Sequence, residues 1–207
     1  SFADPEALAS GRAAAVRAGL DFMRRFGPAD LRDAMPDEPV SYRLYSPART
    51  GMDADDTELG YRVVRFWQGR RGEIDPGKSR ARWSSLDRQQ GLLVSFQSRL
   101  LEKLSGRVVD SQAAFFVTPD KEKEAWSVNT AVYDAAGNRI GRASETGSRS
   151  KRNLQVAIEA PGSERDLRRP YIGDRGYIPR AHAFLLPYLF ADAGIEGEFG
   201  FYVYRSQ

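Results

Sequence analysis

The chain of 207 residues contains no cysteine and a single histidine, His182. The lack of cysteine excludes disulfides, thiolate metal sites and cysteine nucleophiles. One imidazole excludes any site that needs two or more of them, and the sequence predicts a structural role for His182. No apolar run approaches the roughly 18 residues of a membrane-spanning helix. These absences argue against an enzyme and against a resident cofactor or metal.

Motifs that hold phosphates, dinucleotides or a nucleophilic serine are also missing from the sequence. The densest acidic group comprises Asp53, Asp55, Asp56 and Glu58. Read as an EF-hand loop, it has Glu58 where glycine is needed and Val64 where the bidentate glutamate is needed. We therefore expect a solvated loop here rather than a calcium site.

Charges of both signs are interspersed along the chain. There are 31 basic and 28 acidic residues, and only five of the basic residues are lysines. An arginine bias of this kind is most simply explained by a GC-rich genome. Because no segment concentrates the cations as a phosphate-binding surface would, we expect no nucleic-acid partner.

The hydrophobic pattern predicts two helical segments at the ends of the chain and strands between them. The first helix, over residues 4–26, is amphipathic and is expected to pack on a sheet. From residue 40 the pattern has period two. It predicts strands over Val40–Ser46, Glu58–Gln68, Ser79–Leu86, Gly91–Leu101, Arg107–Thr118, Ala125–Tyr133 and Arg139–Thr146, and an eighth marked by Leu154, Val156 and Ile158. A helix over residues 179–190 and a closing strand over Glu198–Arg205 follow.

Consecutive strands joined by short turns indicate an antiparallel meander, and the absence of βαβ alternation disfavours parallel folds. We predict one α+β domain, with a large curved antiparallel sheet whose concave face carries the N-terminal and C-terminal helices. Its parts are a helical segment (1–39), the meander (40–158), a long loop (159–178), and a helix plus closing strand (179–207). The last helix is too short to cross a bilayer and is expected to pack into the concave face.

Aromatic and apolar residues provide the candidate site. They either form the core beneath the helices or line an apolar cavity between sheet and helices, and the sequence leaves both readings open. The candidate ligand-binding residues are Trp67, Trp83, Phe96, Phe115, Trp126, Tyr171, Tyr177, Leu186 and Phe190. Tyr171 and Tyr177 are expected at the rim, where an aromatic body with a polar tip suits both environments.

The order of elements resembles the lipoprotein-carrier-like half-barrels of the bacterial periplasm. The resemblance rests on the N-terminal helix, the long meander, the Glu58-Leu-Gly-Tyr61 strand entry and the helix-plus-strand ending. It is architectural, spans most of the chain and implies a curved sheet, plugged by helices, that holds acyl chains. It also implies a periplasmic or extracellular location, with a leader removed before Ser1.

We therefore predict a non-enzymatic cell-envelope protein that binds an apolar or amphipathic ligand between sheet and helices. Its partners would be a lipid-like ligand or another envelope protein, with peripheral membrane contact at most. The alternative is an interaction or carbohydrate-binding scaffold that uses exposed aromatic residues. A third reading is an enzyme using carboxylates alone, for which Asp110 and Glu145 are the candidate pair.

Overall fold

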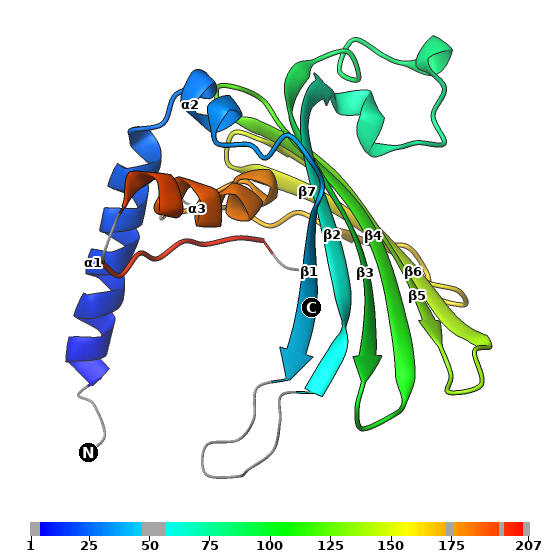
Figure 1. The fold of residues 1–207 in the computed structure, drawn as a ribbon. Helices are drawn as coiled ribbons and strands as arrows, with labels where there is room; N and C mark the ends of the chain where they lie inside the picture. Colours follow the sequence, from blue (N-terminus) through cyan, green and yellow to red (C-terminus); the bar gives the residue numbers. More distant parts are fainter. Residues whose placement is uncertain (1–4, 47–56, 173–175, 195–196, 205–207) are drawn as a thin grey trace, which may run out of the picture.

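The chain folds around one antiparallel sheet in which all eight strands are neighbours in chain order (Figure 1). The computed structural model describes residues 5–46, 57–172, 176–194 and 197–204, and of residues 5–10 and Asp192 it describes the backbone alone. The strands are β1 (Val40–Ser46), β2 (Thr57–Arg70), β3 (Gln90–Glu102), β4 (Arg107–Val117), β5 (Lys123–Tyr133), β6 (Arg139–Ser150), β7 (Asn153–Glu159) and β8 (Asp166–Arg168). The predicted fold class is confirmed.

In the described part of the chain, three α-helices accompany the sheet: α1 (Pro5–Arg24), α2 (Pro28–Asp33) and α3 (Arg180–Ala193). Helix α3 follows Pro179, and it ends at Gly194, whose left-handed conformation (φ 56°) is the common way to terminate a helix. It lies directly on one face of the sheet, as predicted (Figure 1). We call this the inner face and the opposite one the outer face.

Helix α1 forms a second layer over α3 instead of packing on the sheet itself. The ring of Phe22 is 2% exposed, and its centroid lies 4.8 Å from that of Phe190 on α3. The Lys121 side chain joins the C-terminal end of α1 to the β4–β5 turn, because its Nζ donates to the carbonyl oxygens of Met23 and Phe26 at 3.0 and 2.8 Å. The expectation that α1 packs on the sheet is wrong because α3 already occupies that position.

The strand predicted over Ser79–Leu86 is absent, and the chain forms two 3-10 turns, Arg71–Ile74 and Arg80–Arg82, on the outer face. Asp87 accepts from Lys78 Nζ and from the backbone N–H of Ser84, both at 2.7 Å. Such side-chain hydrogen bonds compete with strand pairing. The alternation of apolar and polar residues in the sequence does not indicate them.

The predicted closing strand is also absent from the sheet. Over its described part the chain is extended, and its one bridge joins Tyr202 to Tyr177. The Gly200 N–H donates to the Ala15 carbonyl of α1 at 2.9 Å, so the segment lies beside the helices and passes below α3 in Figure 1. In contrast, the predicted 159–178 loop contains the short strand β8.

Candidate ligand-binding face

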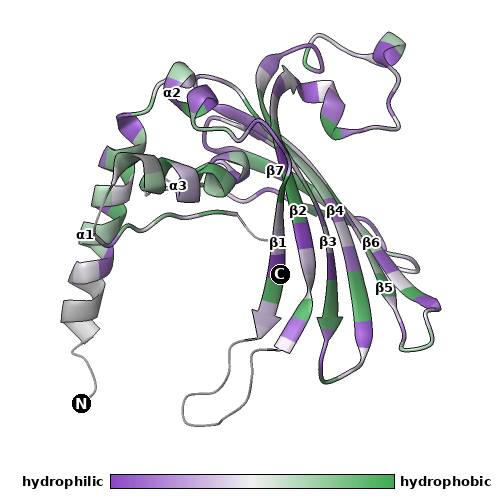
Figure 2. Cartoon of the chain, in the orientation of Figure 1, coloured by the Kyte–Doolittle hydropathy of each residue, from purple (hydrophilic) through white to green (hydrophobic). Residues whose placement is uncertain are grey.

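The inner face divides into a half covered by α3 and a half that α3 leaves open. Hydrophobic and hydrophilic residues alternate along the strands (Figure 2), and the strand register arranges the inward-facing residues in rows across the sheet. In the covered half these residues are mostly buried. They include Val64, Phe66, Leu92, Val94, Phe115, Val117, Trp126, Leu154 and Val156.

Two further rows form the open half. The polar row runs across five strands as Tyr42, Arg62, Ser98, Ser111 and Thr130, and it ends on the sixth strand at Ala143. The apolar row beside it runs as Leu44, Gly60, Leu100, Val109, Val132 and Gly141. Each member of the apolar row is half-buried, so these side chains retain contact with solvent.

Gly60 opens the floor of the apolar row. Its φ of +144° is one that side-chain-bearing residues rarely adopt, and a Cβ there would lie 1.9 Å from the Arg99 carbonyl oxygen. It pairs with Leu44, next to the irregularity between Leu44 and Tyr45. Because Gly60 and Gly141 lack side chains, the apolar row has two low positions, and the aliphatic side chains of the row lie beside them.

Four of the predicted site residues pack as core in or beside the covered half. The centroid of Phe184 on α3 lies 5.7 Å from that of Phe96 and 5.4 Å from that of Phe115. Leu186 and Phe190 belong to the same hydrophobic cluster. These aromatic rings fill the space between α3 and the sheet, so in this half the predicted residues form a core beneath the helix and do not line a cavity.

Trp126, another predicted ligand-binding residue, is 1% exposed and packs over Gly147, which has no side chain. A Cβ on Gly147 would lie 2.1 Å from the indole ring, so the ring covers this glycine. The indole Nε1 donates to Glu145 at 2.5 Å. Trp126 therefore supports the core rather than offering an exposed face.

The other predicted residues lie elsewhere. Trp67 packs on the outer face and its Nε1 donates to Glu73 at 2.8 Å. Trp83 lies against Gly72 of the outer-face turns. Tyr171, 67% exposed, and Tyr177 line a depression of about 830 Å³ beside α1. The structure thus separates Trp67, Trp83 and Tyr171 from the α3 contacts, whereas Tyr177 lies near the start of α3 and bonds to Glu124.

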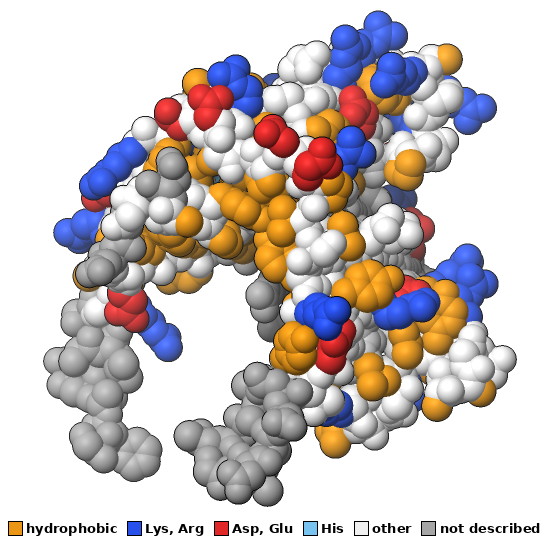
Figure 3. All heavy atoms as spheres, in the orientation of Figure 1, with side chains coloured by type: hydrophobic (Ala, Val, Ile, Leu, Met, Phe, Trp, Pro, Cys, Tyr) orange, Lys and Arg blue, Asp and Glu red, His pale blue; other side chains and the backbone are white. Residues whose placement is uncertain are grey.

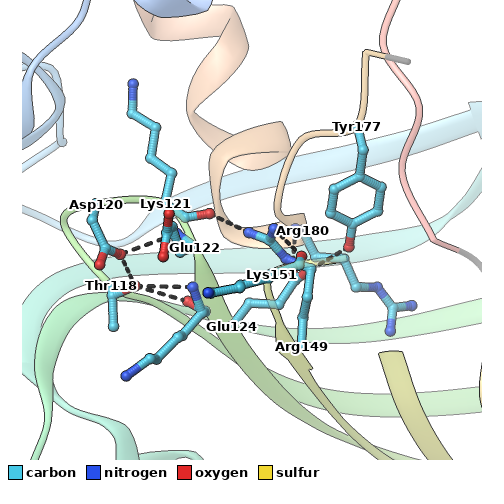
Figure 4. A network of polar contacts seen from close by, with 10 residues as sticks. Thr118, Asp120, Lys121, Glu122, Glu124, Arg149, Lys151, Tyr177 and Arg180 are labelled. Atoms are coloured by element: carbon cyan, nitrogen blue, oxygen red, sulfur yellow. Dashed lines mark hydrogen bonds and ion pairs between the residues drawn. The ribbon is translucent and has the colours of Figure 1, made fainter. Parts of the chain in front are cut away.

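A buried charge network anchors the start of α3 (Figure 4). Glu124 is 2% exposed and accepts from Arg149 Nε at 2.9 Å, from the Tyr177 hydroxyl, and from the Arg180 backbone N–H at 3.1 Å. Burial raises the pKa of Glu124, and the hydrogen bonds and Arg149 oppose that rise. Because Pro179 offers no capping side chain, Glu124 supplies the acceptor and the negative charge that a helix N-terminus favours.

A second buried pair lies beside this network. Arg180 Nη1 donates to Glu145 Oε1 at 2.7 Å, and the guanidinium lies 5.3 Å from the Trp126 ring centroid. Both buried carboxylates are thus balanced by an arginine. Charge balance and complete hydrogen bonding fit a structural role in docking α3.

His182 follows this network on α3 and is 1% exposed. Burial, with the nearby charges of Lys121 and Arg149, lowers its pKa to about 3. It therefore remains neutral at ordinary pH, and its Nδ1 is buried without a hydrogen-bond partner. It borders a depression of about 430 Å³ between α2 and the end of β4.

The boundary between the two halves is polar. The hydroxyls of Tyr42 on β1 and Tyr188 on α3 lie 2.5 Å apart. Next to Tyr42 in the polar row, Arg62 places its guanidinium 4.8 Å from the Phe96 ring centroid. Below this boundary the molecule is hollowed between the helices and the lower ends of the strands (Figure 3).

The candidate carboxylate pair is not brought together. Asp110 lies on the outer face and pairs with Arg99 at 2.7 Å, whereas Glu145 lies on the inner face with Arg180. Within the described part of the chain, no group of three or more histidine or acidic residues could hold a metal ion. Asp53, Asp55 and Asp56 lie outside the described residues, and Glu58 pairs with Arg43 at 3.7 Å.

Sequence reasoning missed the open half for a definable reason. On β2 the alternation Leu59, Tyr61, Val63 and Trp67 attracts attention, yet these residues face outward. The inward-facing residues are Gly60, Arg62, Val64 and Phe66. The glycine and the arginine interrupt the apolar alternation that would mark this face as buried. Cross-strand register would have revealed the polar and apolar rows, but one sequence does not determine register.

In comparisons with known proteins, no family model, no curated protein and no solved structure matches this chain. In the described part of the chain, no helix has the length and apolar character needed to cross a membrane.

Proposed function

We propose that the protein binds an apolar or amphipathic ligand, such as an acyl chain, on the open half of the inner face. The observation that carries the proposal is the apolar row on the inner face, whose aliphatic members Leu44, Leu100, Val109 and Val132 are half-buried and lie outside the hydrophobic cluster that contains α3. Covering such surface releases about 25 cal/mol per Å². An alkyl chain lying across several strands would gain this without disturbing the core.

The neighbouring polar row supports an amphipathic ligand over a purely apolar one. The residues that carry hydroxyl and guanidinium groups lie two positions along their strands from the residues of the apolar row. Ser111 Oγ lies 3.4 Å from Thr130 Oγ1. A ligand with a polar head and an apolar tail would match both rows at once. The predicted envelope location and lipid-like partner belong to the same proposal.

Other surfaces offer less for such a ligand. The outer face has two depressions of about 690 and 740 Å³, which share Asn129, Ser144 and Arg165 and are lined largely by polar and charged side chains. Several of these charges are already paired, including Lys78 with Asp87 and Arg165 with Glu159. Apolar tails would find little matching surface there.

Titration calorimetry with decanol, an uncharged ten-carbon chain, tests the proposal. Two neighbouring leucines on β3 provide a matched pair, because Leu100 belongs to the apolar row of the inner face and Leu101 is 40% exposed on the outer face. We expect wild type and Leu101→Asp to bind decanol and Leu100→Asp to bind at least tenfold more weakly. Absence of binding to wild type, or an equal loss in both variants, would contradict the proposal.

A further inference from the structure

Arg62 is the cation of the polar row, and its position on β2 places it between Tyr42 and Ser98. The side chain is half-buried, and its Nε is buried without a hydrogen-bond partner. Its guanidinium rests over the Phe96 ring. Burial lowers the pKa of Arg62, which nevertheless stays charged because an arginine pKa lies far above neutrality.

Three acidic residues on the described strands of the inner face already have other partners. Glu124 bonds to Arg149, Glu145 to Arg180, and Asp166, at the sheet edge, to Arg168. Among the described residues Arg62 forms no ion pair. A partly buried cation without a counter-charge is costly, so an anion brought in from outside would relieve that cost.

The surroundings favour an oxyanion attached to an alkyl chain. A guanidinium offers several N–H donors in a planar fork that matches carboxylate and phosphate oxygens. The hydroxyl-bearing residues of the polar row continue from Arg62 across β3, β4 and β5, and the apolar row lies directly beside them. A head bound at Arg62 would therefore leave its tail along Leu100 and Val109.

We propose that the ligand of the open half carries an anionic carboxylate or phosphate head, and that Arg62 binds this head. This inference rests on the proposed function and names the chemical class of its ligand. It also assigns the unpaired guanidinium a role in recognition rather than in holding the fold.

Calorimetric titrations of the full chain test the inference, with decanoate and decyl phosphate below their micellar concentrations and decanol below its solubility limit. Because hydrogen bonds to charged groups are stronger than neutral ones, we expect wild type to bind decanoate or decyl phosphate at least tenfold more tightly than decanol. Arg62→Gln should lose this preference and keep its affinity for decanol. The control is Arg65→Gln on the same strand, because Arg65 is exposed and lies over Trp67 on the outer face.

The outcomes separate the two proposals. Equal binding of decanoate, decyl phosphate and decanol by wild type would overturn the role of Arg62 and leave the proposed function standing. Failure of all three to bind would overturn the proposed function and this inference with it. Inorganic phosphate alone competing as well as decyl phosphate would contradict a role for the tail. A fall in the melting temperature of ligand-free Arg62→Gln of more than a few degrees would indicate a structural arginine and contradict the inference.

Discussion

The covered and open halves of the inner face share the same strands and differ in what lies over them. In the covered half, α3 brings Phe184 and Leu185 onto rows of buried apolar residues, and the two buried carboxylates of the described residues, Glu124 and Glu145, each pair with an arginine. In the open half, the aliphatic side chains are half-buried and Arg62 forms no ion pair with another described residue. The comparison teaches that the covered half buries its apolar side chains and pairs its charges within the protein, whereas the open half leaves aliphatic side chains partly exposed to solvent.

The largest effect is expected where α1 meets α3. Phe22→Ala removes a ring whose centroid lies 4.8 Å from those of Phe26 and Phe190. We expect the free energy of unfolding to fall by about 3–5 kcal/mol, because a cavity is left in a packed region. Urea denaturation measures this, and an unchanged midpoint would contradict the second-layer packing of α1.

Breaking the buried charge network should have a nearly equal effect. Glu124→Gln leaves the Arg149 guanidinium buried without its counter-charge, so we expect a loss of about 3 kcal/mol in the free energy of unfolding. The control is Asp110→Asn on the outer face, where the partner Arg99 is half-exposed and the loss should stay below about 1 kcal/mol. Equal losses in both variants would show that burial does not distinguish the two pairs.

His182 allows the covered half to be tested by pH. Its pKa of about 3 in the folded protein lies below its unfolded value of 6.5, so the unfolded chain takes up a proton first as the pH falls. The stability is therefore complete above pH 6.5 and lost progressively toward pH 3. Between pH 7 and 5, wild type should lose about 2 kcal/mol more than His182→Phe.

Denaturation curves at pH 7, 6 and 5 measure this difference, and the chain has no second histidine to obscure it. The raised pKa of Glu124 acts in the opposite direction, since the folded state then binds a proton more readily than the unfolded chain. Both proteins contain Glu124, so its contribution cancels in the comparison. Parallel pH profiles would mean that His182 is accessible to protons in the folded state.

The smallest effect on stability is expected in the open half. Leu100→Ala removes a half-buried side chain, and we expect a loss of about 1 kcal/mol in the free energy of unfolding, little more than for the exposed Leu101→Ala. A loss of 3 kcal/mol or more, measured by urea denaturation, would place Leu100 in a packed core and remove the contrast between the two halves.

Much of the architecture followed from local patterns. Period-two alternation identified seven of the eight strands of the described sheet, because half-buried strands alternate. Two extended-looking segments were misread. Ser79–Leu86 is held by local side-chain bonds to Asp87, and the C-terminal segment packs on helices instead of pairing with a strand.

The candidate site was less accessible from sequence. Phe96 and Phe115 were correctly placed in the space between sheet and helices, yet α3 fills that part of it. The open half depends on register across six strands, and its distinctive members are a glycine and an arginine that alternation treats as interruptions. The candidate site therefore depends on long-range pairing between strands, and no short sequence motif indicates it.

Backbone NMR during a titration with decanol most directly tests the claim that the open half is the ligand site. The account predicts amide shift changes concentrated at Leu44, Leu100, Val109 and Val132, with little change at Phe116 and Ala125 on the outer face. Changes confined to the outer face, or no saturable change anywhere, would contradict it.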